Sequence, residues 1–458
     1  MSGTTQIFEA SASYQVMVLA AALDSGAFPD ADRRILLTSS NGAVPEVARR
    51  IEDDPAVAPL LSRFDAVASF NELIFPLHPK GFRPRPEEVP LFERSFRRDL
   101  GIPADHTIEL ALESIQTPPA RTILTVFAES PVTVYAEGLM SYGPTRDPLK
   151  PQMWSRVERV LHLDLVDGLE PILLSEYGVP AQVVDSAAFR EVVAELAGEP
   201  RPVAEPYALV LGQYLAELGL TTAASEAELY GRCIDAAAAA GLRSVVYKPH
   251  PSAPPSYGEV LARRAVGLGL TFTVCTDAVA AEVLYERERP SMVLGCFSTG
   301  IVTAARFWGI PVACTGTREV LATLPRFEDS NRIPLVLVDL TVPRIGAGAT
   351  PSLLPPRVAD VAAVQRIVAT VSYCMQWRAR SLFRDAAIEH LRSTTDPVRD
   401  YLPRRRLRDL LLPGGVPVPA SAQTFQRVMG MLVGVRSGQL MLQEGLRRIG
   451  VLRRPQPA

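Results

Sequence analysis

Apolar residues in the first part of the chain fall into short runs separated by longer segments with helical spacing. The short runs predict strands at 6–10, 35–39, 64–68, 122–127 and 132–135, and the spaced segments predict helices at 14–24 and 43–51. Strands that alternate with helices are typical of βαβ units, which build a parallel sheet. We therefore expect an α/β domain in this part of the chain.

A second alternating series follows a proline-rich segment at 199–206, which has three prolines in eight residues and reads as a linker. It predicts strands at 207–211, 244–247, 270–274, 292–294, 310–313 and 334–338, with helices at 225–240 and 299–307. We expect an N-terminal Rossmann-like domain over 1–203 and a second one over 204–400. Two such domains facing a central cleft are the GT-B architecture of glycosyltransferases, which some epimerases share.

The C-terminal part has a different pattern. Residues 358–391 predict one or two helices that pack back across the domains. In the tail, 401–458, ten arginines face only Asp409 and Glu444, and apolar residues at near-helical spacing lie between them. Such a basic amphipathic tail can bind an anionic membrane surface, here the inner face of the cytoplasmic membrane. Alternatively, it covers the core with a solvated arginine face.

Composition narrows the class of protein. A net charge of −3 and 47% hydrophobic residues indicate a soluble globular protein and argue against nucleic acid as a partner. The five cysteines lie far apart and read as buried thiols in a reducing compartment. Residues 1–9 do not resemble a signal peptide, and no apolar run approaches about eighteen residues. We expect a cytoplasmic protein, and the sequence has no histidines at a spacing typical of metal ligands.

The strand predicted at 244–247 leads into candidate chemistry. It ends in Lys248, His250 and Pro251, and the prolines hold this segment extended. In open α/β sheets, ligands bind at the carboxyl edge of the strands. A cation beside a histidine at that edge suits a phosphate-bearing ligand. The alternative is a proline-fixed loop with an exposed histidine.

Two further strand ends carry polar groups. The run at 132–135 leads into Glu137 and Gly138, which place a carboxylate at the sheet edge beside a residue that lets a ligand approach. The run at 292–294 leads into Ser298 and Thr299 where a helix begins, and a helix start binds anions through its amides and dipole. A Glu-Gly turn and a serine cap are each common, so the combination matters more than either part.

Glu137-Gly138, His250-Pro251 and Ser298-Thr299 together resemble the three short motifs of bacterial sialyltransferases and polysialyltransferases. Longer segments resemble the alpha-2,8-polysialyltransferase family, at 135–146, 211–214, 248–254 and 330–334. The resemblance covers roughly residues 6–391. One position departs from it, because Ala136 stands where the family usually has the first of two acids.

The resemblance implies an inverting, metal-independent transfer of sialic acid, or a related nonulosonic acid, from a CMP donor to a glycan acceptor, with no cofactor. Glu137 would deprotonate the acceptor hydroxyl, and His250 with Lys248 would neutralise the departing phosphate. The implied substrate-binding residues are Lys248, Pro251, Ser298, Thr299, Gln213, Ser141 and Arg146.

Two alternatives stay open from the sequence. One is a GT-B transferase that uses a nucleoside diphosphate sugar. The other is a non-catalytic glycan-binding or assembly protein, which Ala136 would then mark. If Glu137 were not the base, the next candidates would be Asp164 and Asp167, because Asp167-Gly168 is the other acid-glycine pair after an apolar run.

Overall fold

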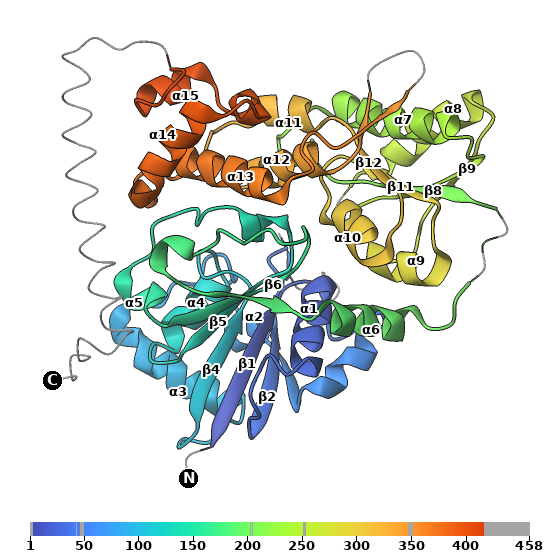
Figure 1. Ribbon diagram of the computed structural model, residues 1–458. Helices are drawn as coiled ribbons and strands as arrows, with labels where there is room; N and C mark the ends of the chain where they lie inside the picture. Colours follow the sequence, from blue (N-terminus) through green and yellow to red (C-terminus); the bar gives the residue numbers. More distant parts are fainter. Residues whose placement is uncertain are drawn as a thin grey trace.

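The computed structural model describes residues 3–42, 44–45, 50–201, 203, 205–250, 253–346 and 351–415. Its first sheet has seven strands, all parallel, in the order β3-β2-β1-β4-β5-β6-β7. Their bounds are β1 Thr4–Ala10, β2 Arg33–Thr38, β3 Ala66–Ser69, β4 Thr107–Leu112, β5 Val132–Ala136, β6 Val157–Leu163 and β7 Ala181–Val184. Central strands such as β5 are buried along their whole length because helices cover both faces of the sheet (Figure 1).

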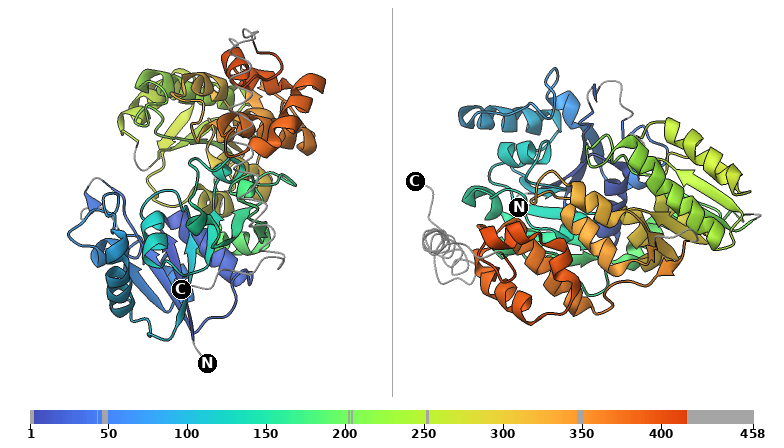
Figure 2. Two further views of the ribbon diagram at one scale, coloured as in Figure 1. Left: turned by 90° about the vertical axis from the view of Figure 1, so that its left-hand side faces the viewer. Right: turned by 90° about the horizontal axis from the view of Figure 1, so that it is seen from above.

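The second sheet also has seven strands, in the order β10-β9-β8-β11-β12-β13-β14. Their bounds are β8 Tyr207–Leu211, β9 Ser244–Lys248, β10 Thr271–Val274, β11 Met292–Gly295, β12 Val312–Cys314, β13 Arg344–Ile345 and β14 Leu353–Leu354. Only the last pair, β13 with β14, is antiparallel among these described strands. The two sheets lie in separate halves of the molecule, which Figure 2 shows from two further sides.

Helices of the first half are α1 Ser13–Asp24, α2 Phe70–Leu73, α3 Val89–Asp99, α4 Ala120–Val126, α5 Pro151–Trp154 and α6 Ser186–Ala197. Those of the second half are α7 Ala223–Ala239, α8 Ser256–Gly267, α9 Ala281–Glu288, α10 Thr299–Trp308, α11 Thr317–Thr323 and α12 Arg332–Thr341. The C-terminal helices α13 Val361–Met375, α14 Arg384–Ser393 and α15 Arg404–Asp409 lie beside the second half and above the first (Figure 1). Two parallel-sheet halves with helices returning across them are the GT-B architecture that the sequence predicts.

Two predicted strands are wrong. Residues 122–127 belong mostly to helix α4, and residues 334–338 lie inside helix α12. In both helices nearly all side chains are buried, so the sequence shows an unbroken apolar run instead of a periodic one. Such a run fits a buried strand and a buried helix equally well, and only the tertiary packing separates them.

Strands β4, β6 and β7 were not predicted, and most of the helix expected at 43–51 lies outside the described residues. All five cysteines are free thiols, and four of them are buried as expected, whereas Cys275 is half-buried. Among the described helices, none is both long and apolar enough to cross a membrane.

The tail predicted at 401–458 is described only as far as residue 415. In this part, Leu407 of α15 is buried, and Arg406 donates hydrogen bonds to Glu328 Oε1 (2.6 Å) and to the carbonyl of Cys374. The beginning of the tail therefore packs on the core. Residues 416–458, on which the membrane prediction mainly depends, lie outside the described residues.

Candidate active site

A cavity of about 640 Å³ lies between the two halves, at the carboxyl ends of both sheets. It is lined by seven of the residues that the sequence singles out: Glu137, Ser141, Arg146, Gln213, His250, Ser298 and Thr299. Pro251 lies outside the described residues. The topology explains the convergence, because the carboxyl ends of parallel strands meet at one edge of each sheet.

Lys248 is the exception among the described candidates. It is the last residue of β9, but it does not line the cavity. Its ammonium group donates a hydrogen bond to the carbonyl of Asp277 (3.1 Å), on the side of the sheet edge next to β10. The Lys248 side chain therefore contacts the loop that follows β10, not the cavity that His250 lines.

Three glutamates lie at the edge of the first sheet: Glu9 belongs to β1, and Glu113 and Glu137 directly follow the neighbouring strands β4 and β5. Burial raises the pKa of Glu9 to about 7, and the charge of Glu137 adds to this shift. The pKa of Glu113 also lies well above its ordinary value. Burial is the largest cause, and the negative charges of Glu137 and Glu9 raise the pKa further. Glu137 has a raised pKa because of burial, although Gln15 Nε2 donates to its Oε1 (3.2 Å). Glu113 and Glu137 both line the cavity, and the negative charge of Glu137 disfavours the ionisation of Glu113.

Among the described residues that line the cavity, two have a buried polar side-chain atom without a hydrogen-bond partner. These atoms are the hydroxyl oxygens of Tyr14, on α1, and of Ser141, in the 3₁₀ turn Leu139–Tyr142. Both residues line the cavity. Since buried polar groups are normally hydrogen-bonded, both hydroxyls are suited to contact a bound substrate.

His250 packs against Tyr214, with the two ring centroids 4.1 Å apart. Burial lowers the pKa of the His250 imidazole, and the charge of Glu226 opposes this effect. Next to Tyr214, the side-chain oxygen of Gln213 accepts a hydrogen bond from the Phe297 amide (3.1 Å). Gln213 thereby connects the end of β8 with the segment that leads into α10.

The N-terminus of α10 faces the same cavity. Ser298 caps this helix, and its hydroxyl oxygen accepts a hydrogen bond from the Gly300 amide (3.2 Å). Thr299 Oγ1 reaches across to the first half, where it accepts from the Leu139 amide (3.4 Å). A Cβ atom on Gly138 would lie 3.2 Å from Thr299 Oγ1. The absence of a side chain at Gly138 thus leaves room for Thr299, and Gly138 also lines the cavity, where the sequence predicts the approach of a ligand.

Arg146 also connects the halves. Its guanidinium donates to Ser330 Oγ (2.8 Å), and its carbonyl accepts from Gln376 Nε2 (2.5 Å). Asp164 and Asp167, the reserve candidates for a base, both bind Arg306 of α10, at 2.5 and 2.8 Å. They are engaged in an ion pair between the halves and do not line the cavity.

Sequence reasoning missed Glu113 and Tyr214. Glu113 directly follows β4, whose alternating pattern at 107–112 was not recognised as a strand, so its strand-end position went unnoticed. Tyr214 directly follows Gln213, but nothing in the sequence indicated its contact with His250. In the described part of the chain, no three histidine, cysteine, aspartate or glutamate side chains converge as metal ligands would.

A protein-family model described as Alpha-2,8-polysialyltransferase (POLYST) matches residues 6–317, which is more than half of the 458 residues. The chain belongs to this family. It is therefore a glycosyltransferase that transfers sialyl groups, with a nucleotide sugar as donor and a glycan as acceptor. A comparison with curated protein sequences finds no match.

Solved structures resemble this polysialyltransferase-family chain only distantly. A sialyltransferase from Photobacterium damsela is 13% identical, with a TM-score of 0.39, over 74% of this chain and 79% of that one. UDP-GlcNAc 2-epimerase from Neisseria meningitidis is 12% identical, with a TM-score of 0.39, over 74% and 90% of the two chains. MurG from Acinetobacter baumannii is 10% identical, with a TM-score of 0.37, over 85% and 95%. Likenesses this remote say nothing about the site.

The geometry offers the groups that glycosyl transfer needs. A carboxylate pair lies on the side of the first half, and an imidazole and a helix N-terminus lie on the side of the second. The carboxylates can take a proton, while the imidazole and the helix amides can stabilise a negative charge. Ala136 removes the family's first acid, yet Glu113 supplies a second carboxyl group to the same cavity.

Proposed function

We propose that the protein transfers sialic acid, or a related nonulosonic acid, from its CMP derivative to a glycan, with inversion and without a metal ion. One observation carries this proposal: Glu137 and His250 come from opposite halves and line one cavity. An acceptor held beside Glu137 and a donor phosphate held beside His250 would therefore lie on opposite sides of the sugar ring. This arrangement favours a single displacement with inversion.

Glu137 takes the proton of the acceptor hydroxyl as the acceptor oxygen bonds to the anomeric carbon. The bond between that carbon and the CMP phosphate oxygen breaks, and CMP leaves with its extra charge. His250 faces this charge and donates a proton or a hydrogen bond to it. Burial lowers the pKa of His250, and a bound phosphate opposes that effect by favouring the imidazolium.

Ser298 and the N-terminus of α10 are suited to hold the donor phosphate or carboxylate. Gln213 and Tyr214 lie beside them and are suited to contact the cytidine part of the donor. We do not assign phosphate binding to Lys248, because its ammonium group binds the carbonyl of Asp277.

The roles proposed for Glu137 and His250 predict that variants of the two residues differ in their effects on turnover and on donor affinity. Glu137→Gln keeps the shape of the side chain but cannot take a proton, so transfer should fall by about 10²- to 10⁴-fold while donor affinity survives. His250→Ala removes a group that faces the phosphate, so both turnover and donor affinity should fall. CMP release from CMP-sialic acid and calorimetric donor binding measure the two effects.

The exposed strand glutamate variant Glu158→Gln is the matched control and should behave like the wild type. Near wild-type transfer by Glu137→Gln would refute the assigned base. A hundredfold loss of activity in EDTA that Mg²⁺ restores would refute the metal-free mechanism. Turnover of a nucleoside diphosphate sugar but not of CMP-sialic acid would favour the alternative transferase. Donor binding without turnover would favour the non-catalytic glycan-binding or assembly protein.

We also propose that the enzyme works in the cytoplasm, with its tail in peripheral contact with the inner face of the membrane. Residues 416–458 contain six arginines and one glutamate, which supports attraction to anionic lipid. A chain ending at Gly415 should stop sedimenting with phosphatidylserine vesicles and keep its melting temperature. Equal sedimentation of both chains would refute the contact, and neutral phosphatidylcholine vesicles are the control.

A further inference from the structure

Gln15 lies behind Glu137 and connects it with the start of helix α1. Its side chain is buried (5% exposed) and does not line the cavity between the halves. Gln15 Nε2 donates a hydrogen bond to Glu137 Oε1 (3.2 Å). Gln15 Oε1 accepts from the backbone amide of Ser11 (2.6 Å) and from its hydroxyl group (3.2 Å). One side-chain amide thus joins the first turn of α1 to a residue 122 positions away in the chain.

The orientation of the Gln15 amide follows from its partner at Ser11. A backbone N–H group donates a hydrogen bond and cannot accept one, so the atom that faces it must be the side-chain oxygen of Gln15. The NH₂ group is therefore directed to Glu137. A flipped amide would place two donors against each other at Ser11 and two acceptors against each other at the Glu137 carboxylate.

The local sequence explains why Gln15 reaches back to Ser11. Helix α1 begins at Ser13, and its N-cap residue, Ala12, makes no side-chain hydrogen bond to the first turn. Gln15 is the third residue of the helix, the position from which the glutamine or glutamate of a capping box reaches back to a backbone amide. One end of the Gln15 side chain is therefore anchored to the backbone, and the other end holds Glu137.

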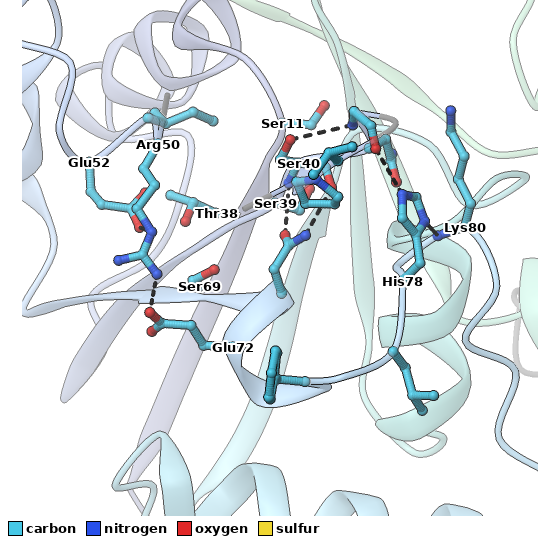
Figure 3. A pocket seen from close by; sticks show the side chains of 18 of the residues that line it. Ser11, Thr38, Ser39, Ser40, Arg50, Glu52, Ser69, Glu72, His78 and Lys80 are labelled. Atoms are coloured by element: carbon cyan, nitrogen blue, oxygen red, sulfur yellow. Dashed lines mark hydrogen bonds and ion pairs between the residues drawn. The ribbon is translucent and has the colours of Figure 1, made fainter. Parts of the chain in front are cut away.

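Gln15 also lies in the wall between two cavities. Ser11 lines a second cavity of the first half, of about 1390 Å³, beside the carboxyl ends of β1, β2 and β3 (Figure 3). Glu137 lines the cavity between the halves. Gln15 is hydrogen-bonded to both residues and lines neither cavity. Since this wall is buried, its hydrogen bond to Glu137 is stronger than it would be in water.

A general base benefits from such a contact. The last torsion angle of a glutamate side chain has a broad distribution, so it does not by itself fix the rotation of the carboxylate. A donor at Glu137 Oε1 selects one rotation and stabilises the ionised form, which is the form that takes a proton. Burial raises the pKa of Glu137, and hydrogen bonds from its own backbone and from Gln15 oppose this effect.

We propose that Gln15 is a positioning residue for Glu137, which holds the carboxylate in the orientation that takes the proton of the acceptor hydroxyl. The proposal rests on the proposed sialyl transfer, because Gln15 would act through the base of that reaction. The Gln15 amide keeps its own hydrogen atoms throughout, and the proton from the acceptor moves to the Glu137 carboxylate.

A purely structural role is the alternative, in which Gln15 only caps α1. The two roles use different ends of the side chain and can therefore be separated. Gln15→Glu keeps an acceptor for the Ser11 amide but replaces the donor at Glu137 by a second carboxyl group. Gln15→Met removes both polar ends and nearly keeps the length. A cap alone predicts wild-type behaviour for Gln15→Glu, and a loss of stability without a changed pH profile for Gln15→Met.

The positioning role predicts a changed pH profile for both variants. Two carboxyl groups in contact resist ionising together, so the pair in Gln15→Glu keeps a proton up to a higher pH. In Gln15→Met the ionised form of Glu137 loses a donor. The acidic limb of kcat/KM should therefore lie at a higher pH than in the wild type, and kcat at neutral pH should fall by about 10- to 100-fold. The Kd of CMP, measured by calorimetry, should change less than about twofold, because the groups proposed to bind the donor are unaltered.

The other titratable and charged groups around Glu137 are the same in the wild type and in both variants. They lie at the edge of the first sheet, on α1 and around the cavity, and comprise Glu9, Glu113, Tyr14, Tyr135, Arg146 and His250. A shifted limb therefore reports on the Gln15 side chain. Gln152→Glu and Gln152→Met are the matched controls, because Gln152 on α5 is exposed and lines neither cavity.

The outcomes distinguish this inference from the proposed reaction. Release of CMP by the wild type, with the acidic limb at the same pH in both Gln15 variants, would support the reaction and overturn the inference. Carbon-13 NMR of the Glu137 carboxyl group, assigned with Glu137→Gln, gives a readout without turnover. A Glu137 titration that Gln15→Met moves to a higher pH, together with no release of CMP from any CMP sugar, would support the contact and refute the reaction.

Discussion

At the scale of single residues, the arrangement of carboxyl groups matters most. Leu112 of β4 pairs with Val134 of β5, so Glu113 lies level with Tyr135 and one pleat away from Glu137. Glu113 has its pKa raised well above the ordinary value, and the charge of Glu137 contributes to this. Glu113 therefore keeps its proton up to a higher pH than an ordinary glutamate does. Ala136 stands where the family usually has its first acid, but Glu113 and Glu137 still place two carboxyl groups in the cavity.

This pair predicts a pH profile. A raised pKa means that Glu137 loses its charge at a higher pH than an ordinary glutamate does. The acidic limb of kcat/KM should consequently lie above about pH 4.5, and activity should be lost as the pH falls through it. Glu113→Gln should retain turnover within about tenfold at neutral pH, because an amide resembles a protonated carboxyl group. An acidic limb at the ordinary carboxylate value would contradict this account.

At the scale of elements, one buried glutamate on α7 holds the segment that follows β8. Glu226 accepts hydrogen bonds from the amides of Leu215 (3.0 Å) and Ala216 (2.8 Å), and from the hydroxyl groups of Tyr230 (2.6 Å) and Tyr257 (3.0 Å). This segment begins with Gln213 and Tyr214, which line the site. The position of the site residues thus depends on a helix behind them.

Glu226→Gln tests this dependence. The glutamine amide has one acceptor oxygen, so one of the two backbone amides would lose its partner in a buried place. We expect the free energy of unfolding to fall by about 1–3 kcal/mol and the KM for the donor to rise. Urea denaturation and initial rates measure these effects. Glu228→Gln, on the same helix but exposed in its ion pair with Arg264, should change neither.

At the scale of the whole molecule, the segment after α13 ties the C-terminal helices to the first half. Arg380 forms an ion pair with Glu176 (3.2 Å) and donates to Ser175 Oγ (3.0 Å). Both charged side chains are almost fully buried. Gln365 of α13 adds a second connection, because its side-chain oxygen accepts from the Glu170 amide (2.8 Å). These contacts set how the two walls of the cavity face each other.

Removing one partner of the buried ion pair between Arg380 and Glu176 should therefore destabilise the enzyme strongly. Arg380→Met leaves the Glu176 carboxylate buried without its cation, which should lower the free energy of unfolding by about 3–5 kcal/mol. The double variant Arg380→Met, Glu176→Leu should recover most of this loss, because no buried charge remains. Denaturant unfolding followed by tryptophan fluorescence measures both. A double variant as unstable as the single one would contradict the explanation.

The sequence by itself determined that the chain forms two α/β halves with largely parallel sheets, and it singled out strand-end residues that line one cavity. Short apolar runs such as 132–135 and 244–247 are strands, and their polar continuations at Glu137 and His250 line one cavity. This could be predicted because parallel strands all present their carboxyl ends at one edge, so a position in the chain translates into a position in space.

Only the tertiary structure decided how ambiguous segments fold and where side chains point. The apolar runs at 122–127 and 334–338 lie in helices that bury most of their side chains, and such short apolar runs lack the periodicity that distinguishes a helix from a strand. The ammonium group of Lys248 binds the carbonyl of Asp277, and Glu113 and Glu137 line one cavity. Asn41 and Glu52 line another cavity, in the first half. These contacts join residues that are distant in the chain, and no local pattern encodes them.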